Sequence, residues 1–321
     1  MLETETVLDR RRLRRSVSFW RGAGIAGLAL AIGALTFGSD KLTKLTGQKQ
    51  IARVAIEGTI TEDRNQLKML KEIGDADNVE GVLLFVNSPG GTTTGGEALY
   101  EALREIGRKK PVVAQFGTVA ASAGYIVGLA TDHIVARGNT ITGSVGVIVQ
   151  WPEFVQLMDK LGVKMNEVKS GPLKASPSPF EQLSEGGRKV AEGMVNDGFK
   201  WFLGLVEARR YVKPADVPGL LDGRIFSGRE ALEAKLVDQI GGEDEAVRWL
   251  KDVRNVDKDA KVVEWKPEAS SGFGFAGMAS RALSQLFGPG MAQLTGLLLG
   301  DGAISPLALD GLVSVWHPSE K

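Results

Sequence analysis

The chain has 321 residues, of which 43% are hydrophobic and 24% are charged, so it is long enough for one large globular domain or two modest ones. Its 39 basic and 39 acidic side chains balance, and a general nucleic-acid partner is therefore not expected. It contains no cysteine, which excludes a disulfide framework, cysteine-bound zinc and a thiol nucleophile.

The N-terminal region has the charge pattern of a membrane anchor. Residues 1–21 carry six arginines against three acidic side chains, and the 17 residues at 22–38 carry no charge. As a helix this apolar run spans roughly 26 Å, near the lower limit for crossing a bilayer. A buried helix and a cleaved signal peptide are alternatives, but the run is longer than a usual signal-peptide core and no clear cleavage site follows. We therefore predict a transmembrane signal anchor at 22–38, a cytoplasmic basic segment at 1–21 and a polar tether at 39–50.

The next segment alternates between short apolar runs and stretches with helical spacing. The expected strands are 51–58, 81–87, 111–116, 133–136, 145–150 and 163–168, and the expected helices are 64–73, 97–106, 121–129 and 152–162. Most of the strands are continuous apolar runs, a pattern typical of strands covered on both faces. The alternation predicts an α/β fold with a largely parallel, buried sheet.

The second half of the chain continues this pattern before its composition changes. Apolar residues recur at helical spacing over 180–209, which predicts one long helix. A strand, helix, strand and helix are then expected, with Ser227 and Glu230 placed as a capping box. The main domain is expected to cover 51–266. The tail at 267–321 is rich in glycine and aliphatic residues, and we interpret it as a docked or interfacial segment.

One serine stands among small residues in the stretch "GTVAASAGYIVG", where a buried strand passes into a helix. Ser122 in this position would point at a substrate, while the backbone N–H groups at the helix start suit an oxyanion. Its small neighbours would let a peptide backbone come close. The alternative is that Ser122 only caps the helix. The stretch also differs from the G-x-S-x-G motif, because Ala120 replaces the first glycine.

A serine nucleophile needs a base, and the chain has only two histidines. His317 lies almost at the chain end, and His133 lies at the start of an expected strand, so neither is well placed for a catalytic triad. A lysine can serve if its amine is neutral, which requires desolvation or a nearby positive field. Lys174 lies in the proline-rich, apolar stretch "SGPLKASPSPFEQL", which is a credible place for such a lysine. The alternative is an ordinary surface lysine.

A pair of glycines follows the strand expected at 81–87. In "NSPGG", Gly90 and Gly91 can turn backbone N–H groups toward a ligand. A phosphate loop is a poor alternative because the segment lacks G-K-[ST], whereas a simple strand-to-helix loop is a fair one.

Taken together, four segments carry a resemblance that none of them carries alone. The chain resembles the S49 family of serine peptidases, in its short bacterial signal peptide peptidase A form, through "LLFVNSPGGTTTGGEALYEAL", "GTVAASAGYIVGLATDHIVARGNTITGSVGVI", "SGPLKASPSPFEQLSEGGR" and "DGRIFSGREALEAKLVDQIGG". The resemblance covers about residues 51–250. It implies a ClpP/crotonase-like spiral of ββα units, here preceded by the transmembrane helix.

The resemblance also implies the site residues. Ser122 matches the family nucleophile and Lys174 the general base, which in this family can come from a neighbouring protomer. Ser144 matches a serine that orients the lysine amine, and the oxyanion donors would be the N–H groups of Gly90 or Gly91 and of Ala123. The chain departs from the family pattern at Leu173, where a tyrosine is usual, and at Gly186-Gly187, which interrupts the usual "E-E-R".

These observations predict a membrane-anchored serine endopeptidase at the cytoplasmic membrane, with its catalytic domain outside the cytoplasm. Its substrates would be extended apolar peptides such as remnant signal peptides, bound by strand addition. Neither a cofactor nor a metal is required, and the family implies a homo-oligomer. Two alternatives remain: a crotonase-like acyl-CoA enzyme, which would need neither Ser122 nor Lys174, and a non-catalytic membrane scaffold.

Overall fold

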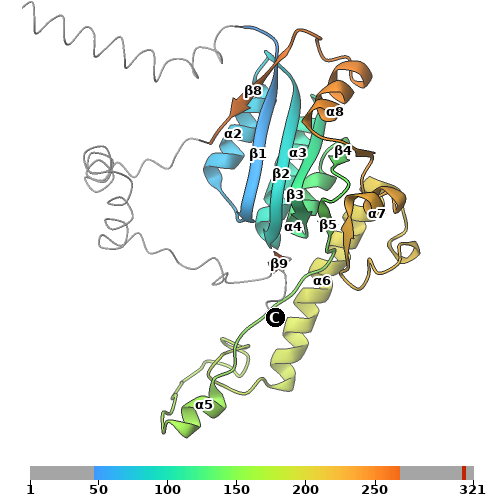
Figure 1. Cartoon of the computed structure of the whole chain (residues 1–321). Helices are drawn as coiled ribbons and strands as arrows, with labels where there is room; N and C mark the ends of the chain where they lie inside the picture. The colour runs from blue at the N-terminus through green and yellow to red at the C-terminus, as the bar shows by residue number, and fades with distance from the viewer. Residues whose placement is uncertain (1–46, 268–312, 316–321) are drawn as a thin grey trace, which may run out of the picture. The chain divides into compact units, whose positions relative to one another are not determined.

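The computed structural model of the chain describes residues 47–267 together with the backbone of residues 313–315 (Figure 1). In this part of the chain the strands form one sheet, with the central order β6-β5-β3-β2-β1-β8. All pairings are parallel except those of β5 with β6 and of β2 with β9. The strands are β1 (Gln50–Ile60), β2 (Val79–Thr92), β3 (Val112–Ala121), β4 (His133–Ala136), β5 (Ile141–Gly143), β6 (Ile225–Ser227), β7 (Gln239–Ile240), β8 (Lys261–Trp265) and β9 (Val313–Val315).

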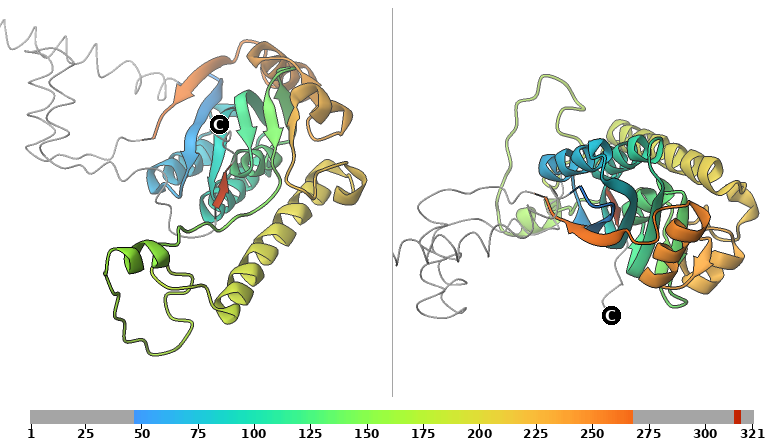
Figure 2. Two further views of the ribbon diagram at one scale, coloured as in Figure 1. Left: turned by 60° about the horizontal axis from the view of Figure 1, so that its bottom comes forward. Right: turned by 90° about the horizontal axis from the view of Figure 1, so that it is seen from above.

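Helices cover the sheet on both faces, as Figure 2 shows for α2 and α3 on one side and α8 on the other. The α-helices are α2 (Arg64–Asp75), α3 (Thr93–Gly107), α4 (Ala123–Leu129), α5 (Val155–Lys160), α6 (Glu185–Arg210), α7 (Gly228–Glu233) and α8 (Glu243–Arg248). A 3-10 turn at Pro214–Asp216 follows α6, and a π-helical turn at Trp249–Val253 follows α8. The predicted α/β architecture with a largely parallel sheet is confirmed.

The two faces of the sheet bury separate apolar clusters. On the larger side, α2, α3 and α4 pack against residues such as Val54, Leu84 and Ala114. On the smaller side, α8 and the turn after it pack against the intervening positions, such as Leu83 and Val113. Successive residues of β2 and β3 therefore face opposite clusters, which is why these strands are continuous apolar runs in the sequence.

Two of the expected strands are absent from the sheet. Residues 145–150 contain one isolated bridge, and Val145 and Val147 are buried without a strand ladder; a Cβ at Gly198 of α6 would lie 3.4 Å from Val147. Residues 163–168 are an exposed loop in which the hydrophobic side chains find no sheet partner. In both segments alternating aliphatic residues imitate a strand pattern, but within the described residues neither segment forms a ladder with a strand of the sheet.

Several boundaries also differ from those expected. β2 does not end at 87 but continues to Thr92, because β1 stays paired with it as far as Ile60 opposite Gly91. The long helix begins only at Glu185, where the Ser184 hydroxyl accepts a hydrogen bond from the Gly187 N–H, and the expected helix at 152–162 is reduced to α5. The capping box predicted at the start of α7 is confirmed.

None of the helices in residues 47–267 is long and apolar enough to span a bilayer. The predicted anchor at 22–38 lies outside the described residues, as does all of the tail beyond Pro267 except residues 313–315.

The helix that follows Ser122 is fixed to the core by a buried hydroxyl, and this gives a stability prediction. The Tyr125 hydroxyl donates a hydrogen bond of 2.8 Å to the Leu236 carbonyl, and burial raises the pKa of this phenol. Tyr125→Phe leaves that carbonyl without its donor and should lower the free energy of unfolding by about 1–2 kcal/mol. Tyr211→Phe is the control, since Tyr211 is 89% exposed and should unfold like the wild type in urea. Equal unfolding midpoints for both variants would contradict the prediction.

Candidate active site

Ser122 lies at the junction of β3 and α4 in a strained backbone conformation. Its φ of 57° and ψ of −120° belong to a region that side-chain-bearing residues rarely adopt, at a cost of about 1–3 kcal/mol. Hydrogen bonds on both sides hold it there: its N–H donates to the Gly143 carbonyl at 2.9 Å, and its own carbonyl accepts from Tyr125 and Ile126. Strain of this kind concentrates at functional sites, and a strand-to-helix turn of this form presents a nucleophile.

The alternative role of Ser122 as a helix cap finds no support in its side chain. Ser122 occupies the N-cap position of α4, but its hydroxyl makes no capping hydrogen bond. Instead the residue, only 1% exposed, lines a cavity of about 320 Å³. The strained serine is thus directed at a small cavity and does not stabilise the helix end.

The same cavity brings Ser144 to Ser122. Ser144 follows β5 directly and also has a positive φ, of 51°; its N–H donates to the Arg224 carbonyl at 2.9 Å. Aliphatic and aromatic side chains form most of the remaining wall, and Asp222 stands among them; the full lining is Ser122, Ser144, Val145, Gly146, Val147, Ile148, Val195, Phe199, Leu221, Asp222 and Gly223. The aliphatic part of this wall suits an apolar group next to the serine.

Close backbone approaches near the end of β2 leave no room for a side chain. A Cβ added at Gly124 would lie 2.8 Å from the Ser88 carbonyl oxygen, and one at Gly91 would lie 1.8 Å from that of Ile60. Only glycine fits at either position. Gly90 has a φ of 122°, and its N–H donates to the Ser88 hydroxyl at 3.1 Å. Of the two predicted oxyanion donors on this loop, Gly90 therefore has its N–H engaged by a side chain in this structure.

Buried polar side chains hold the segments around Ser122, and their role was not predicted from the sequence. Ser88 is fully buried, and its hydroxyl accepts a hydrogen bond from the Gly90 N–H. The Asn87 side-chain oxygen accepts a hydrogen bond from the Val119 N–H at 3.3 Å. The Thr142 hydroxyl donates to the Ala120 carbonyl at 2.7 Å and so joins β5 to β3. A polar Asn-Ser pair directly after a buried strand was the available signal, because buried polar side chains need hydrogen-bond partners.

Lys174 does not line the cavity of Ser122. It lies in a turn in which its N–H donates to the Gly171 carbonyl, on the segment 149–184, here called the arm. Figure 1 shows this segment leaving the sheet after β5 and returning at α6, with α5 at its far end. No residue of α5 is buried. The structure brings Ser122 and Ser144 together within one chain but leaves Lys174 apart from them.

The arm carries a concentration of exposed apolar side chains. They are Phe154, Leu157, Leu161, Val163, Met165, Val168, Leu173 and Phe180. Lys169 on the same arm is paired with Glu167 at 2.8 Å and Glu181 at 2.7 Å, and these carboxylates raise the pKa of its amine. Lys169 is therefore held charged and is unsuited to act as a base.

His133, which the sequence placed poorly for a catalytic base, lies in a different environment from Ser122. His133 begins β4, as expected, and its ring stacks on Trp249 with the ring centres 4.8 Å apart. Its Nε2 lies 3.2 Å from the Gln239 side-chain oxygen, and the residue does not line the cavity of Ser122. His317 lies outside the described residues.

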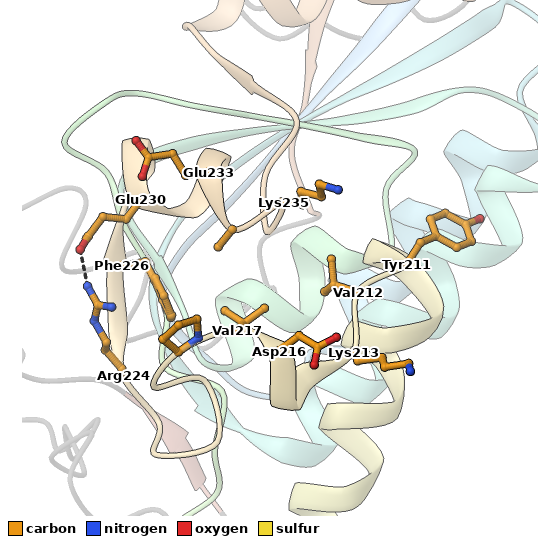
Figure 3. Close-up of a pocket in the computed structure, with 12 residues that line it drawn as sticks. Tyr211, Val212, Lys213, Asp216, Val217, Arg224, Phe226, Glu230, Glu233 and Lys235 are labelled. Atoms are coloured by element: carbon orange, nitrogen blue, oxygen red, sulfur yellow. Dashed lines mark hydrogen bonds and ion pairs between the residues drawn. The ribbon is translucent and has the colours of Figure 1, made fainter.

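A larger cavity, of about 710 Å³, lies between the end of α6, β6 and α7 (Figure 3). Side chains of both charges line it, including Lys213, Asp216 and Glu233, and Arg224 pairs there with Glu230. It contains neither Ser122 nor Ser144. Volume alone does not identify an active site, and we assign the candidate site to the smaller cavity because the strained serine lines it.

The chain is similar in sequence to known proteases. The family model "Peptidase family S49" matches residues 104–257, and the model "Clp protease" matches residues 44–138, in agreement with a ClpP-like α/β fold. A protein of Synechocystis sp. provisionally named a protease is 34% identical over 67% of this chain and 78% of its own length. A protein of Enterococcus faecium provisionally named signal peptide peptidase SppA is 34% identical over 76% of each chain. Protease 4 of Haemophilus influenzae is 32% identical over 81% of this chain and 45% of its own length.

The contact between Gly124 and Ser88 yields a testable consequence. A methyl group at Gly124 would push the β2 loop away from α4, so Gly124→Ala should lower peptide hydrolysis about 10-fold or more and destabilise the fold by about 1–3 kcal/mol. Gly204→Ala in α6 is the matched control, because a Cβ there meets nothing within 4 Å. It should keep wild-type activity and be slightly more stable, as alanine favours helix over glycine. Full activity in Gly124→Ala would show that this contact does not position the site.

Proposed function

The chain belongs to peptidase family S49 and is therefore a peptide hydrolase, and we propose that Ser122 is its nucleophile and Lys174 its general base. The observation that carries the proposal is the strained conformation of Ser122 beside a cavity that also holds Ser144. A serine kept at a positive φ by hydrogen bonds on both sides is pre-organised for attack, and the family supplies the reaction.

The base comes, in this proposal, from a neighbouring copy of the chain. Lys174 lies on the arm, away from the cavity of Ser122 in its own chain, so the dyad is incomplete within one protomer. The exposed apolar side chains of the arm form a surface typical of protein contacts, and a second copy of the chain would bury them. Docking of the arm would also remove water from around Lys174, which favours a neutral amine. These features support a homo-oligomer in which each protomer donates its lysine to the next.

The proposed reaction is acyl transfer in two steps. The neutral Lys174 amine takes the proton of Ser122 as Oγ attacks the scissile carbonyl, and the ammonium then protonates the leaving amine. A water molecule hydrolyses the acyl-enzyme, with the same amine as base. Ser144 would accept a hydrogen bond from the lysine and aim it at Ser122, since both serines line one cavity.

The oxyanion of the tetrahedral intermediate would be stabilised by backbone N–H groups. Ala123 follows the nucleophile directly, and the Ser88 carbonyl, two residues before Gly90, packs against Gly124 of the same turn. Because the Ser88 hydroxyl already accepts from Gly90, use of the Gly90 N–H would require Ser88 to release it. The smallest set of oxyanion donors in this proposal is the Ala123 N–H together with the N–H of one of the two glycines.

The substrates proposed are extended apolar peptides, including remnant signal peptides. The mostly aliphatic wall of the Ser122 cavity, with Val145, Val147 and Phe199, favours a small or aliphatic side chain next to the scissile bond. A crotonase-like acyl-CoA enzyme would need neither the strained serine nor the lysine arm. A non-catalytic scaffold would need no strain at Ser122 at all. Both alternatives are therefore less well supported.

The shared dyad is tested by combining two inactive variants. Ser122→Ala and Lys174→Ala should each lose hydrolysis of a fluorogenic apolar peptide by at least ~1,000-fold, whereas Lys164→Ala on the same arm should stay active. Co-expression of the two inactive chains should restore about one quarter of wild-type activity, because that share of randomly mixed neighbours pairs an intact serine with an intact lysine.

The outcomes of this experiment separate the possible arrangements. No recovery on co-expression, with both single variants inactive, would place the lysine in the same chain as the serine. Full activity in either single variant would show that the reaction does not use a dyad of Ser122 and Lys174. Turnover of a CoA thioester without peptide hydrolysis would favour the crotonase-like alternative.

We also propose that residues 22–38 anchor the chain in the cytoplasmic membrane, with the peptidase domain outside the cytoplasm. The charge pattern supports this orientation, because positively charged segments stay on the cytoplasmic side. Protease added to intact spheroplasts should therefore degrade the domain, and a cytoplasmic marker protein should survive as the control. A domain that stays protected until the cells are lysed would indicate the opposite orientation, with the peptidase domain in the cytoplasm.

A further inference from the structure

The cavity of Ser122 contains one carboxylate. Of the eleven residues that line it, Asp222 is the only one with a charged side chain. Among the residues that the structure describes, this exposed carboxylate has neither a hydrogen bond nor a salt bridge. The nearest basic residue in the sequence, Arg224, pairs instead with Glu230 and lies over the Phe226 ring (Figure 3). The carboxylate of Asp222 is therefore available to a cation from outside the domain.

The turn that carries Asp222 is fixed to the site by its backbone. The Gly219 carbonyl accepts hydrogen bonds from the N–H groups of Asp222, at 3.2 Å, and of Arg224, at 3.1 Å. The Arg224 carbonyl in turn accepts the hydrogen bond from the Ser144 N–H at 2.9 Å. Leu220 in the same turn is fully buried. One connected set of hydrogen bonds thus holds both the second serine of the cavity and its carboxylate.

An apolar wall with a carboxylate matches a long basic side chain. Lysine and arginine have an aliphatic stem that packs on apolar surface and a cationic head that seeks a polar partner. The stem would contact the apolar side chains of the cavity, which include Val145, Val147, Phe199 and Leu221. The head would form a charge-assisted hydrogen bond with Asp222. An acidic side chain in the same place would bring two like charges together.

The other cation that could meet this carboxylate is the proposed base, Lys174 of a second copy. A carboxylate that paired with the base would favour its charged form, as Glu167 and Glu181 do for Lys169. Such a pair would withhold the neutral amine that the proposed reaction needs. Asp222 is therefore better suited to bind the substrate than to bind the base.

We propose that Asp222 is a specificity-determining residue that binds a lysine or arginine side chain next to the scissile bond of an otherwise apolar peptide. The inference rests on the proposed function, because it takes Ser122 as the nucleophile. It narrows the substrate class to peptides in which a basic residue adjoins apolar ones. Signal peptides have this pattern where their positively charged segment meets their apolar core. The preferred bond would lie at that junction.

The test compares three internally quenched apolar peptides that differ at one central position, which holds lysine, norleucine or glutamate. The wild type should hydrolyse the lysine peptide with a kcat/KM about 5–30-fold above that for the norleucine peptide, and the glutamate peptide should be the poorest. Product masses should place the cut next to the lysine. Asp222→Asn should bring the lysine-to-norleucine ratio close to one, and Asp222→Lys should favour glutamate instead.

A matched control and a salt series separate charge recognition from a structural effect. Asp216→Asn removes another exposed carboxylate, six residues earlier, that lines the larger cavity and not that of Ser122. It should keep the wild-type ratio. Raising the NaCl concentration from about 50 to about 500 mM should shrink the ratio in the wild type and leave it unchanged in Asp222→Asn, because salt screens the attraction between charges.

Binding to an inactive chain keeps this inference separate from the proposed nucleophile. In fluorescence anisotropy, Ser122→Ala should bind the lysine peptide more tightly than the norleucine peptide, and Ser122→Ala with Asp222→Asn should bind both equally. A wild-type ratio close to one would overturn the inference. So would an equal fall for all three peptides in Asp222→Asn, because that would place Asp222 in the general support of the site. Full hydrolysis by Ser122→Ala would instead count against the nucleophile, and the effect of Asp222→Asn on the ratio would still decide the role of Asp222.

Discussion

The hydrogen bond from the Ser122 N–H to the Gly143 carbonyl is the contact on which the site depends. At 2.9 Å it joins the end of β3 to the end of β5 and holds Ser122 at a φ that its side chain disfavours. Without this bond the turn could relax toward an ordinary conformation, because the strain of about 1–3 kcal/mol has to be offset by neighbouring contacts. The buried Tyr125, in the first turn of α4, supplies a second anchor through its hydroxyl.

The same contact explains why Ser144 reaches the site. β5 is only three residues long, yet its last residue, Gly143, accepts from Ser122 and its successor is Ser144. The Ser144 N–H in turn donates to the Arg224 carbonyl, next to β6, so the turn is held from both neighbouring strands. Two residues 22 positions apart in sequence thus share one cavity because a short ladder fixes the backbone at both of them.

The sequence predicted the features that depend on a local residue pattern. It did not predict the features that depend on contacts with residues far away in the chain or in another chain. The alternation of buried strands and helices follows from residue order, and it was confirmed. The run at 145–150 looks like a strand, but its valines pack without a ladder, and periodicity cannot tell whether a neighbouring strand is present. The position of Lys174 was beyond prediction for a related reason: the arm packs so little against its own domain that its place depends on what else it meets.

The small residues around Ser122 have a different use from the one their sequence suggests. They were expected to leave room for a peptide, but Ala120, Ala121 and Ala123 are fully buried by the protein itself. Their size, with that of Gly124, lets the end of β2 come within contact of the nucleophile turn, where the Ser88 carbonyl packs against Gly124. β3 pairs with β2 only as far as Ser88 opposite Ala120. β9 pairs with β2 at Gly90–Thr92, and Lys174, the proposed base, lies on the arm and does not line the cavity of Ser122. In the proposed function the dyad is completed only when the arm of a second copy docks at this cavity, whereas the strained turn at Ser122 is already formed within one chain.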